Sequence, residues 1–201
     1  MIFTSGVVSG VNSYAAVLVL GLIGRFGHVA AIPSVLENPS VLVAAAVLYA
    51  GQFIVGKIPV LDVGWDAVHT VLRPVVAGAI GVVVAQHAGS GSGATVAAAV
   101  LGGGAALASH TVKTGVRVGV NASPEPFSTA IVSLLEDGSV AGLTWWAVYH
   151  PLPAAIAAAV ALAAGIAAMV LLASRIRRAW RRRREARDLR REARELRETA
   201  V

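Results

Sequence analysis

Two sets of residues that include charged side chains have helical spacing within residues 1–174, which otherwise carry little charge. Asp62, Asp66, His69 and Arg73 follow one another at intervals of three or four residues. At 100° per residue they lie within an arc of about 60° on one helix. Such a face could line a water-filled path and exchange protons. It could instead form a ladder of ion pairs at a helix end, or a divalent-metal site, which Arg73 disfavours.

A second set lies on one face of the segment 94–118. Its members are Gly103, Ala106, His110, Lys113 and Arg117. The small residues at its start allow close approach of another helix. The cations at its end could bind an anion, reach the membrane surface, or pair with carboxylates such as Glu136 and Asp137. Those two acids could also form a plain turn. We predict no metal site and no cofactor, and the chain has no cysteine.

The elements that position these residues are predicted to be membrane helices. The chain is 56% hydrophobic and 14% charged, against about 25% charged in soluble domains. Its clearest span is 151–173, which contains no charged residue and is long enough to cross about 30 Å of hydrocarbon. We predict an all-α, polytopic membrane bundle of about five spans plus short or re-entrant segments.

The remaining segments are shorter or interrupted. Spans are expected at 7–23, 41–56 and 94–118. Proline breaks helices, so Arg73-Pro74 should separate a half-helix 61–72 from a helix 74–86, as a re-entrant hairpin or one bent span. Two short segments, 127–135 and 140–149, should flank Glu136-Asp137. Arg73-Pro74 and His150-Pro151 look like matching joints of an internal repeat, a layout of many transporters.

The C-terminal region differs from the rest of the chain. Residues 1–174, the predicted transmembrane domain, contain six acids and five cations, whereas residues 175–201 contain five acids and twelve arginines. Arginines directly after a span indicate a cytoplasmic end at a bacterial inner membrane. This helical tail should contact anionic lipid head groups, or a second copy or another membrane partner, and not nucleic acid.

Catalytic motifs are absent, so we do not expect an enzyme. Our leading hypothesis is a transporter- or channel-like protein whose polar faces handle a small anion or an anionic lipid head group. The alternative is a structural or accessory membrane protein, in which the charges pair with one another and the tail recruits a partner.

Several short motifs also resemble a known family. They are Gly10-Val-Asn-Ser-Tyr14, Gly24-Arg25-Phe-Gly27, Lys57-Ile-Pro-Val-Leu-Asp62 with Asp66, Pro74 with Ala77-Gly78, and Gly102-Gly-Gly-Ala-Ala106 with Arg117, Glu136 and Pro151. Over about residues 6–172 the chain resembles the bacterial membrane-protein family called domain of unknown function 4126. The resemblance implies a membrane fold and no established activity. Gln52 stands near the place of a glutamate that is usual in that family.

Overall fold

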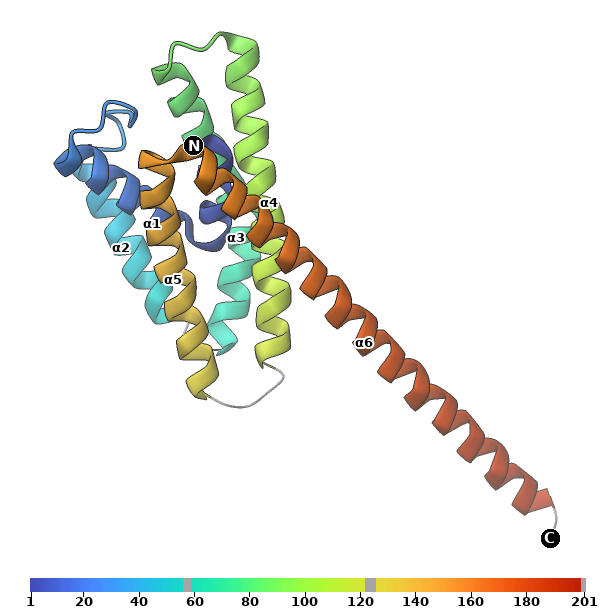
Figure 1. The fold of residues 1–201 in the computed structure, drawn as a ribbon. Coiled ribbons are helices and arrows are strands. Elements are labelled where there is room, and N and C mark those ends of the chain that lie inside the picture. Colours follow the sequence, from blue (N-terminus) through green and yellow to red (C-terminus); the bar gives the residue numbers. More distant parts are fainter. Residues whose placement is uncertain (56–58, 122–125, 200–201) are drawn as a thin grey trace. The chain divides into compact units, whose positions relative to one another are not determined.

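The computed structural model describes residues 1–55, 59–121 and 126–199, and all regular secondary structure within them is helical (Figure 1). The helices are α1 (Ile2–Gly27), α2 (Pro39–Val55), α3 (Pro59–His87), α4 (Ser92–Asn121), α5 (Pro126–Tyr149) and α6 (Pro151–Thr199). The chain forms two compact units, Met1–Gly165 and Ile166–Val201. The first unit contains α1 to α5 and the beginning of α6.

Helices α3 and α4 form an antiparallel pair joined by a short turn at Gly89, whose φ is +71°. Small residues bring the two backbones together, because a Cβ at Gly81 would lie 2.5 Å from the Ala98 carbonyl oxygen. Helix α3 continues through Pro74. Of the two arrangements expected for 61–72 and 74–86, the re-entrant hairpin is therefore wrong, and the segments form one long helix. Proline is tolerated in membrane helices where neighbouring groups satisfy the freed carbonyls.

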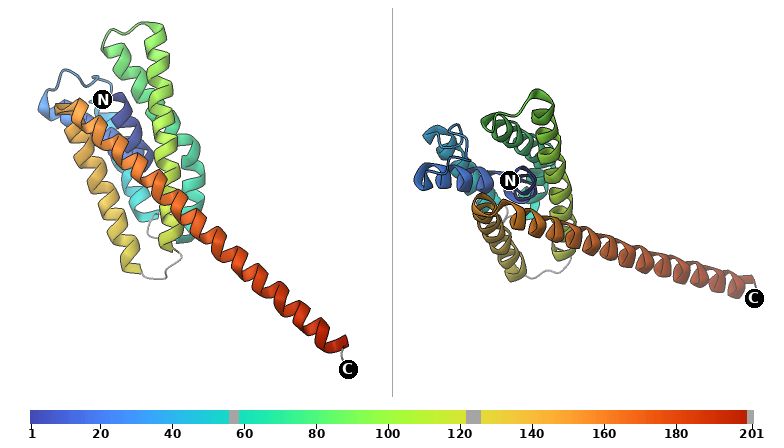
Figure 2. Two further views of the ribbon diagram at one scale, coloured as in Figure 1. Left: turned by 45° about the vertical axis from the view of Figure 1, so that its right-hand side comes forward. Right: turned by 45° about the horizontal axis from the view of Figure 1, so that its top comes forward.

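Helix α1 is itself a hairpin, because its two halves run in opposite directions (Figures 1 and 2). Its first half follows α4, with Gly6 against Gly102 and Gly10 against Ala106. Its second half follows α3, which runs antiparallel to α4. Met1 and Ile2 consequently pack against the same buried cluster as Leu20. The segment expected to cross the membrane at 7–23 lies within Ile2–Gly27, which is long and apolar enough to span, but the chain turns back at Asn12.

Four helical segments are long and apolar enough to cross a membrane: Ile2–Gly27, Ala67–His87, Ser92–Val116 and Pro151–Arg175. A shorter apolar helix spans Pro39–Val55. These segments confirm the expected all-α membrane bundle. Helix α5 runs unbroken through Glu136-Asp137, so two separate segments at 127–135 and 140–149 were a wrong prediction. The two positions expected to match in an internal repeat also differ, since the chain leaves the helix at His150 but not at Arg73.

The contact between α1 and α4 gives a direct test of the hairpin. A Cβ at Gly10 would meet the Ala106 carbonyl oxygen, whereas a Cβ at Gly104 on α4 would meet nothing within 4 Å. We expect Gly10→Ala to cost about 1–3 kcal/mol, because a backbone must move. The matched Gly104→Ala change should be neutral or stabilise the helix by up to about 1 kcal/mol. Thermal unfolding in detergent measures both, and equal midpoints would contradict the close contact.

Candidate functional site

Helix α1 is interrupted at Asn12, inside the first unit. The Asn12 backbone has φ −153° and ψ 96°, an extended conformation that ends one half-helix and precedes the next. The Asn12 side-chain oxygen accepts the N–H of Ala15 at 3.1 Å, which is the N-cap arrangement of a helix that begins at Ser13. We call residues 10–13 the hairpin tip.

Carbonyl groups at the end of the first half-helix receive hydrogen bonds from two other helices. Arg73 on α3 donates through Nη1 to the Gly10 carbonyl at 2.9 Å, and Lys113 on α4 donates through Nζ to the Val11 carbonyl at 2.7 Å. A broken helix leaves such carbonyls without donors, and cations also favour the negative end of the helix dipole. The two cations therefore stabilise the hairpin tip.

Helix α5 brings two carboxylates to the same place. Glu136 Oε2 lies 3.0 Å from Lys113 Nζ, and the two side chains are only 16% and 4% exposed. Asp137 accepts hydrogen bonds from Asn12 Nδ2 at 2.9 Å and from the Tyr49 hydroxyl at 3.1 Å. The hairpin tip thus lies between two cations and two carboxylates, whose formal charges cancel.

Hydrogen bonds also determine the proton position on His110. Arg73 Nη1 lies 2.8 Å from His110 Nδ1, and the Thr70 hydroxyl lies 3.1 Å from His110 Nε2. A guanidinium is only a donor, so Nδ1 must accept and the ring is neutral with its proton on Nε2. His110 therefore donates to Thr70 and links α4 to α3 beside the hairpin tip.

His69 joins α3 to the second half of α1. Its Nδ1 lies 2.7 Å from the Trp65 carbonyl oxygen, which can only accept, so Nδ1 carries a proton. In the neutral ring, Nε2 then accepts from the Tyr14 hydroxyl at 2.9 Å. The Trp65 ring stacks on His69 with centroids 4.9 Å apart. This cluster fixes Tyr14, two residues beyond the break.

The family model described as domain of unknown function (DUF4126) matches residues 1–171. The chain belongs to the DUF4126 family. The match contains the hairpin tip and every contact described above, whereas residues 172–201 lie outside it. No curated protein and no solved structure matches the chain. The family resemblance predicted from the sequence motifs is thereby confirmed, and the family description names no activity.

In this DUF4126 protein, the two predicted polar faces meet at one place. His69 and Arg73 from α3 and His110 and Lys113 from α4 are all buried, with at most 7% exposure. Glu136 and Asp137 face them from α5. The side chains of Asp62, Asp66 and Arg117 lie outside the described part of the structure. Within that part, no cluster of three or more acidic or His side chains could hold a metal ion.

Several partners in the DUF4126 site were not predicted as site residues from the sequence. They are the Gly10 and Val11 carbonyls, the cap Asn12, and the side chains of Tyr14, Tyr49 and Thr70. One available signal was the pattern Gly6-x-x-x-Gly10 followed by Asn12-Ser13 within an apolar segment. Small residues at this spacing indicate close helix packing, and Asn and Ser favour helix starts.

The first half of α1 also carries buried hydroxyl groups. Thr4 and Ser9 are both 0% exposed. Neither hydroxyl has a hydrogen-bond partner among the described residues. Buried polar atoms are usually paired with protein or with ordered water. Both hydroxyls lie on the half-helix that leads to the hairpin tip, but five positions apart and therefore about 140° apart around its axis.

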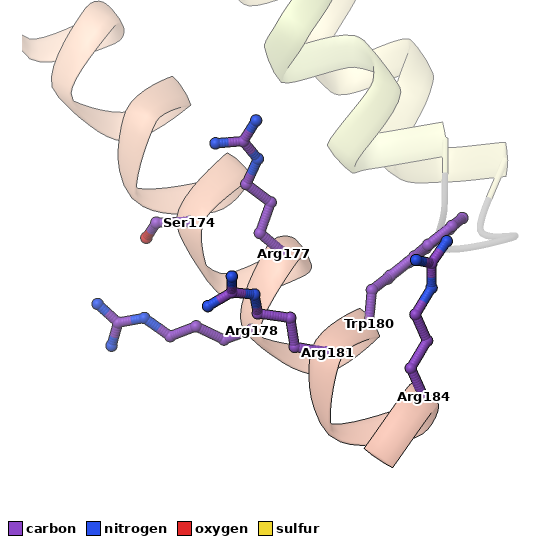
Figure 3. Close-up of a pocket in the computed structure, with 6 residues that line it drawn as sticks. All are labelled: Ser174, Arg177, Arg178, Trp180, Arg181 and Arg184. Atoms are coloured by element: carbon purple, nitrogen blue, oxygen red, sulfur yellow. The ribbon is translucent and has the colours of Figure 1, made fainter. Parts of the chain in front are cut away.

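The second unit of the protein is the C-terminal part of α6, which is apolar to Ala173, basic from Arg175 and described to Thr199. Six residues line a hollow on its surface: Ser174, Arg177, Arg178, Trp180, Arg181 and Arg184 (Figure 3). The four arginines are exposed, and Trp180 is 64% exposed. The expected helical tail is present. The side chains of the acidic residues from Glu185 onward lie outside the described part.

Proposed function

We propose that this protein is a transporter- or channel-like membrane protein and that the hairpin tip is its binding site. The proposed ligand is a small anion, or the anionic head group of a lipid. The observation that carries the proposal is the break in α1. The backbone at this break lies among buried charged side chains from three other helices. Discontinuous helices of this kind form substrate and ion sites in many transporters.

The contacts at Lys113 support an anionic ligand. Lys113 already holds one carboxylate, that of Glu136, at 3.0 Å. An incoming anion of similar size would replace this carboxylate and leave the Lys113 bond to the Val11 carbonyl intact. The N-terminal end of the second half-helix adds a positive partial charge close by. The Glu136 carboxylate thus occupies the proposed anion site at Lys113, and a free anion binds there by displacing it.

We also propose a bacterial inner-membrane location with the C-terminus in the cytoplasm. The arginines that follow the apolar part of α6 support this orientation through the positive-inside rule. Five helices, α2 to α6, follow the hairpin in the chain. If each crosses once, the hairpin enters the membrane from the side opposite the tail.

Flux measurements test the proposal. Arg73→Ala and Lys113→Ala should each lower transport by about tenfold or more, because a hydrogen bond to a charged group contributes about 1.5–3 kcal/mol. Arg117→Ala removes the remaining cation of the second predicted face and is expected to lower transport as well. Proteoliposomes loaded with chloride, nitrate or phosphate report anion flux, and labelled phospholipid reports head-group movement. Arg25→Ala is the matched control, since Arg25 is exposed and donates to the Glu37 carbonyl at 3.3 Å. Wild-type rates of both processes in the three variants would overturn the proposal.

A second candidate function is a structural or accessory membrane protein. The pairing of Lys113 with Glu136 favours it, because an ion pair of this kind also stabilises a bundle without any ligand. This candidate predicts lower thermal stability in the same variants, with no anion flux and no lipid movement in the wild type. It further predicts that deletion of residues 176–201 abolishes association with a membrane partner.

A further inference from the structure

We propose that the basic helix of the second unit contains a binding site for anionic phospholipid. Arg177, Arg181 and Arg184 hold the head-group phosphate, and Trp180 anchors the same surface at the membrane boundary. This site is independent of the hairpin tip and of any transport activity. It also lies outside the segment that matches the DUF4126 family.

The spacing of the three arginines places them on one face of the helix. Positions 177, 181 and 184 are separated by four and three residues, so they lie within about 60° on the helix. In Figure 3 the side chains of Trp180 and Arg184 extend in the same direction, whereas Arg178 extends away from them. All six labelled residues line one hollow. Guanidinium groups bind phosphate oxygens through paired hydrogen bonds.

The position of the hollow along α6 indicates a lipid as its occupant. The apolar part of α6 continues to Ala173, and Trp180 is seven residues further along the same helix. Seven residues correspond to about 10 Å along the helix axis, which places Trp180 near the outer edge of a head-group layer about 5–8 Å deep. Exposed tryptophan is enriched at that depth, and arginine beside a span attracts anionic lipid. Charge and position together therefore favour a phospholipid over a soluble acidic partner.

Lipid selectivity of the full-length protein tests this site. We would reconstitute the protein in phosphatidylcholine and add spin-labelled phosphatidylglycerol or spin-labelled phosphatidylcholine as a trace probe. The motionally restricted fraction of each probe in the electron paramagnetic resonance spectrum gives their relative affinity. We expect the wild type to prefer phosphatidylglycerol by about threefold to fivefold. Inorganic phosphate at matched ionic strength should not remove the preference, because the anchor is a lipid.

Two triple variants that lose the same charge distinguish a specific phosphate site from general electrostatic attraction between the helix and anionic lipid. Arg177→Gln, Arg181→Gln and Arg184→Gln together should reduce the preference to near one. Arg175→Gln, Arg182→Gln and Arg183→Gln remove the same charge from other positions of the helix and should preserve most of it. Equal losses in the two variants would overturn the site. So would an absence of preference in the wild type, as expected for a helix that contacts another protein.

Discussion

Replacing Glu136 with glutamine should lower the thermal unfolding midpoint of the detergent-purified protein by on the order of 10 °C. The change removes the carboxylate 3.0 Å from Lys113, whose side chain is only 4% exposed. Removing one partner of a buried ion pair typically costs about 3–5 kcal/mol, because the remaining charge stays buried. For a domain of this size each 1 kcal/mol shifts the midpoint by about 2–4 °C.

A double variant shows whether the effect belongs to the pair. Lys113→Met combined with Glu136→Gln removes both charges, so it should be more stable than the sum of the two single changes predicts. Glu37→Gln, in the connector between α1 and α2, is the control for loss of a carboxylate and should have little effect. Strict additivity of the two single changes would contradict a direct ion pair.

Anions connect this stability effect to the proposed function. In the Glu136→Gln variant, chloride or nitrate should raise the unfolding midpoint more than gluconate does, because a small anion can take the place of the lost carboxylate. The Lys113→Met variant should show no such difference. If Glu136→Gln is destabilised but no anion restores it, the pair is structural and the accessory-protein candidate gains support.

The sequence predicted which residues share a helix face better than it predicted where the helices break. Helical spacing placed His69 with Arg73 and His110 with Lys113 on common faces, and all four side chains are buried. Spacing within one helix follows from local geometry alone. It does not reveal which helices meet. The contacts of Arg73 with Gly10 and of Lys113 with Val11 join positions 63 and 102 residues apart in the chain.

The expected and observed breaks differ for one physical reason. Pro74 and the pair Glu136-Asp137 looked like breaks because they disfavour an isolated apolar helix. In the bundle, Glu136 and Asp137 find partners on other helices, and α3 and α5 remain continuous. Asn12 lies inside the span expected at 7–23, and α1 breaks there. Its freed carbonyls receive donors that only the folded bundle provides, so tertiary contacts decide where the backbone can leave the helix.

Arg73 should be as sensitive as the ion pair. It is 1% exposed and donates through Nη1 both to the Gly10 carbonyl and to His110 Nδ1. Replacing it with methionine takes the donor from two buried acceptors, each of which costs about 1–3 kcal/mol when left unpaired. We therefore expect Arg73→Met to cost about 2–5 kcal/mol in the free energy of unfolding and to lower any anion flux. Arg25→Met, at an exposed position, should change neither.

A mutant cycle with His110 separates the contribution of Arg73 to the hairpin tip from its contribution to α4. His110→Phe removes the Nδ1 acceptor but leaves the Gly10 carbonyl and its donor in place. The double change should cost less than the sum of the single changes by about 0.5–3 kcal/mol, because either one already removes the Arg73–His110 bond. The double variant should still be less stable than His110→Phe alone, since the Gly10 bond is lost as well. If the two are equally stable, Arg73 does not hold the hairpin tip, and the break in α1 needs another cause.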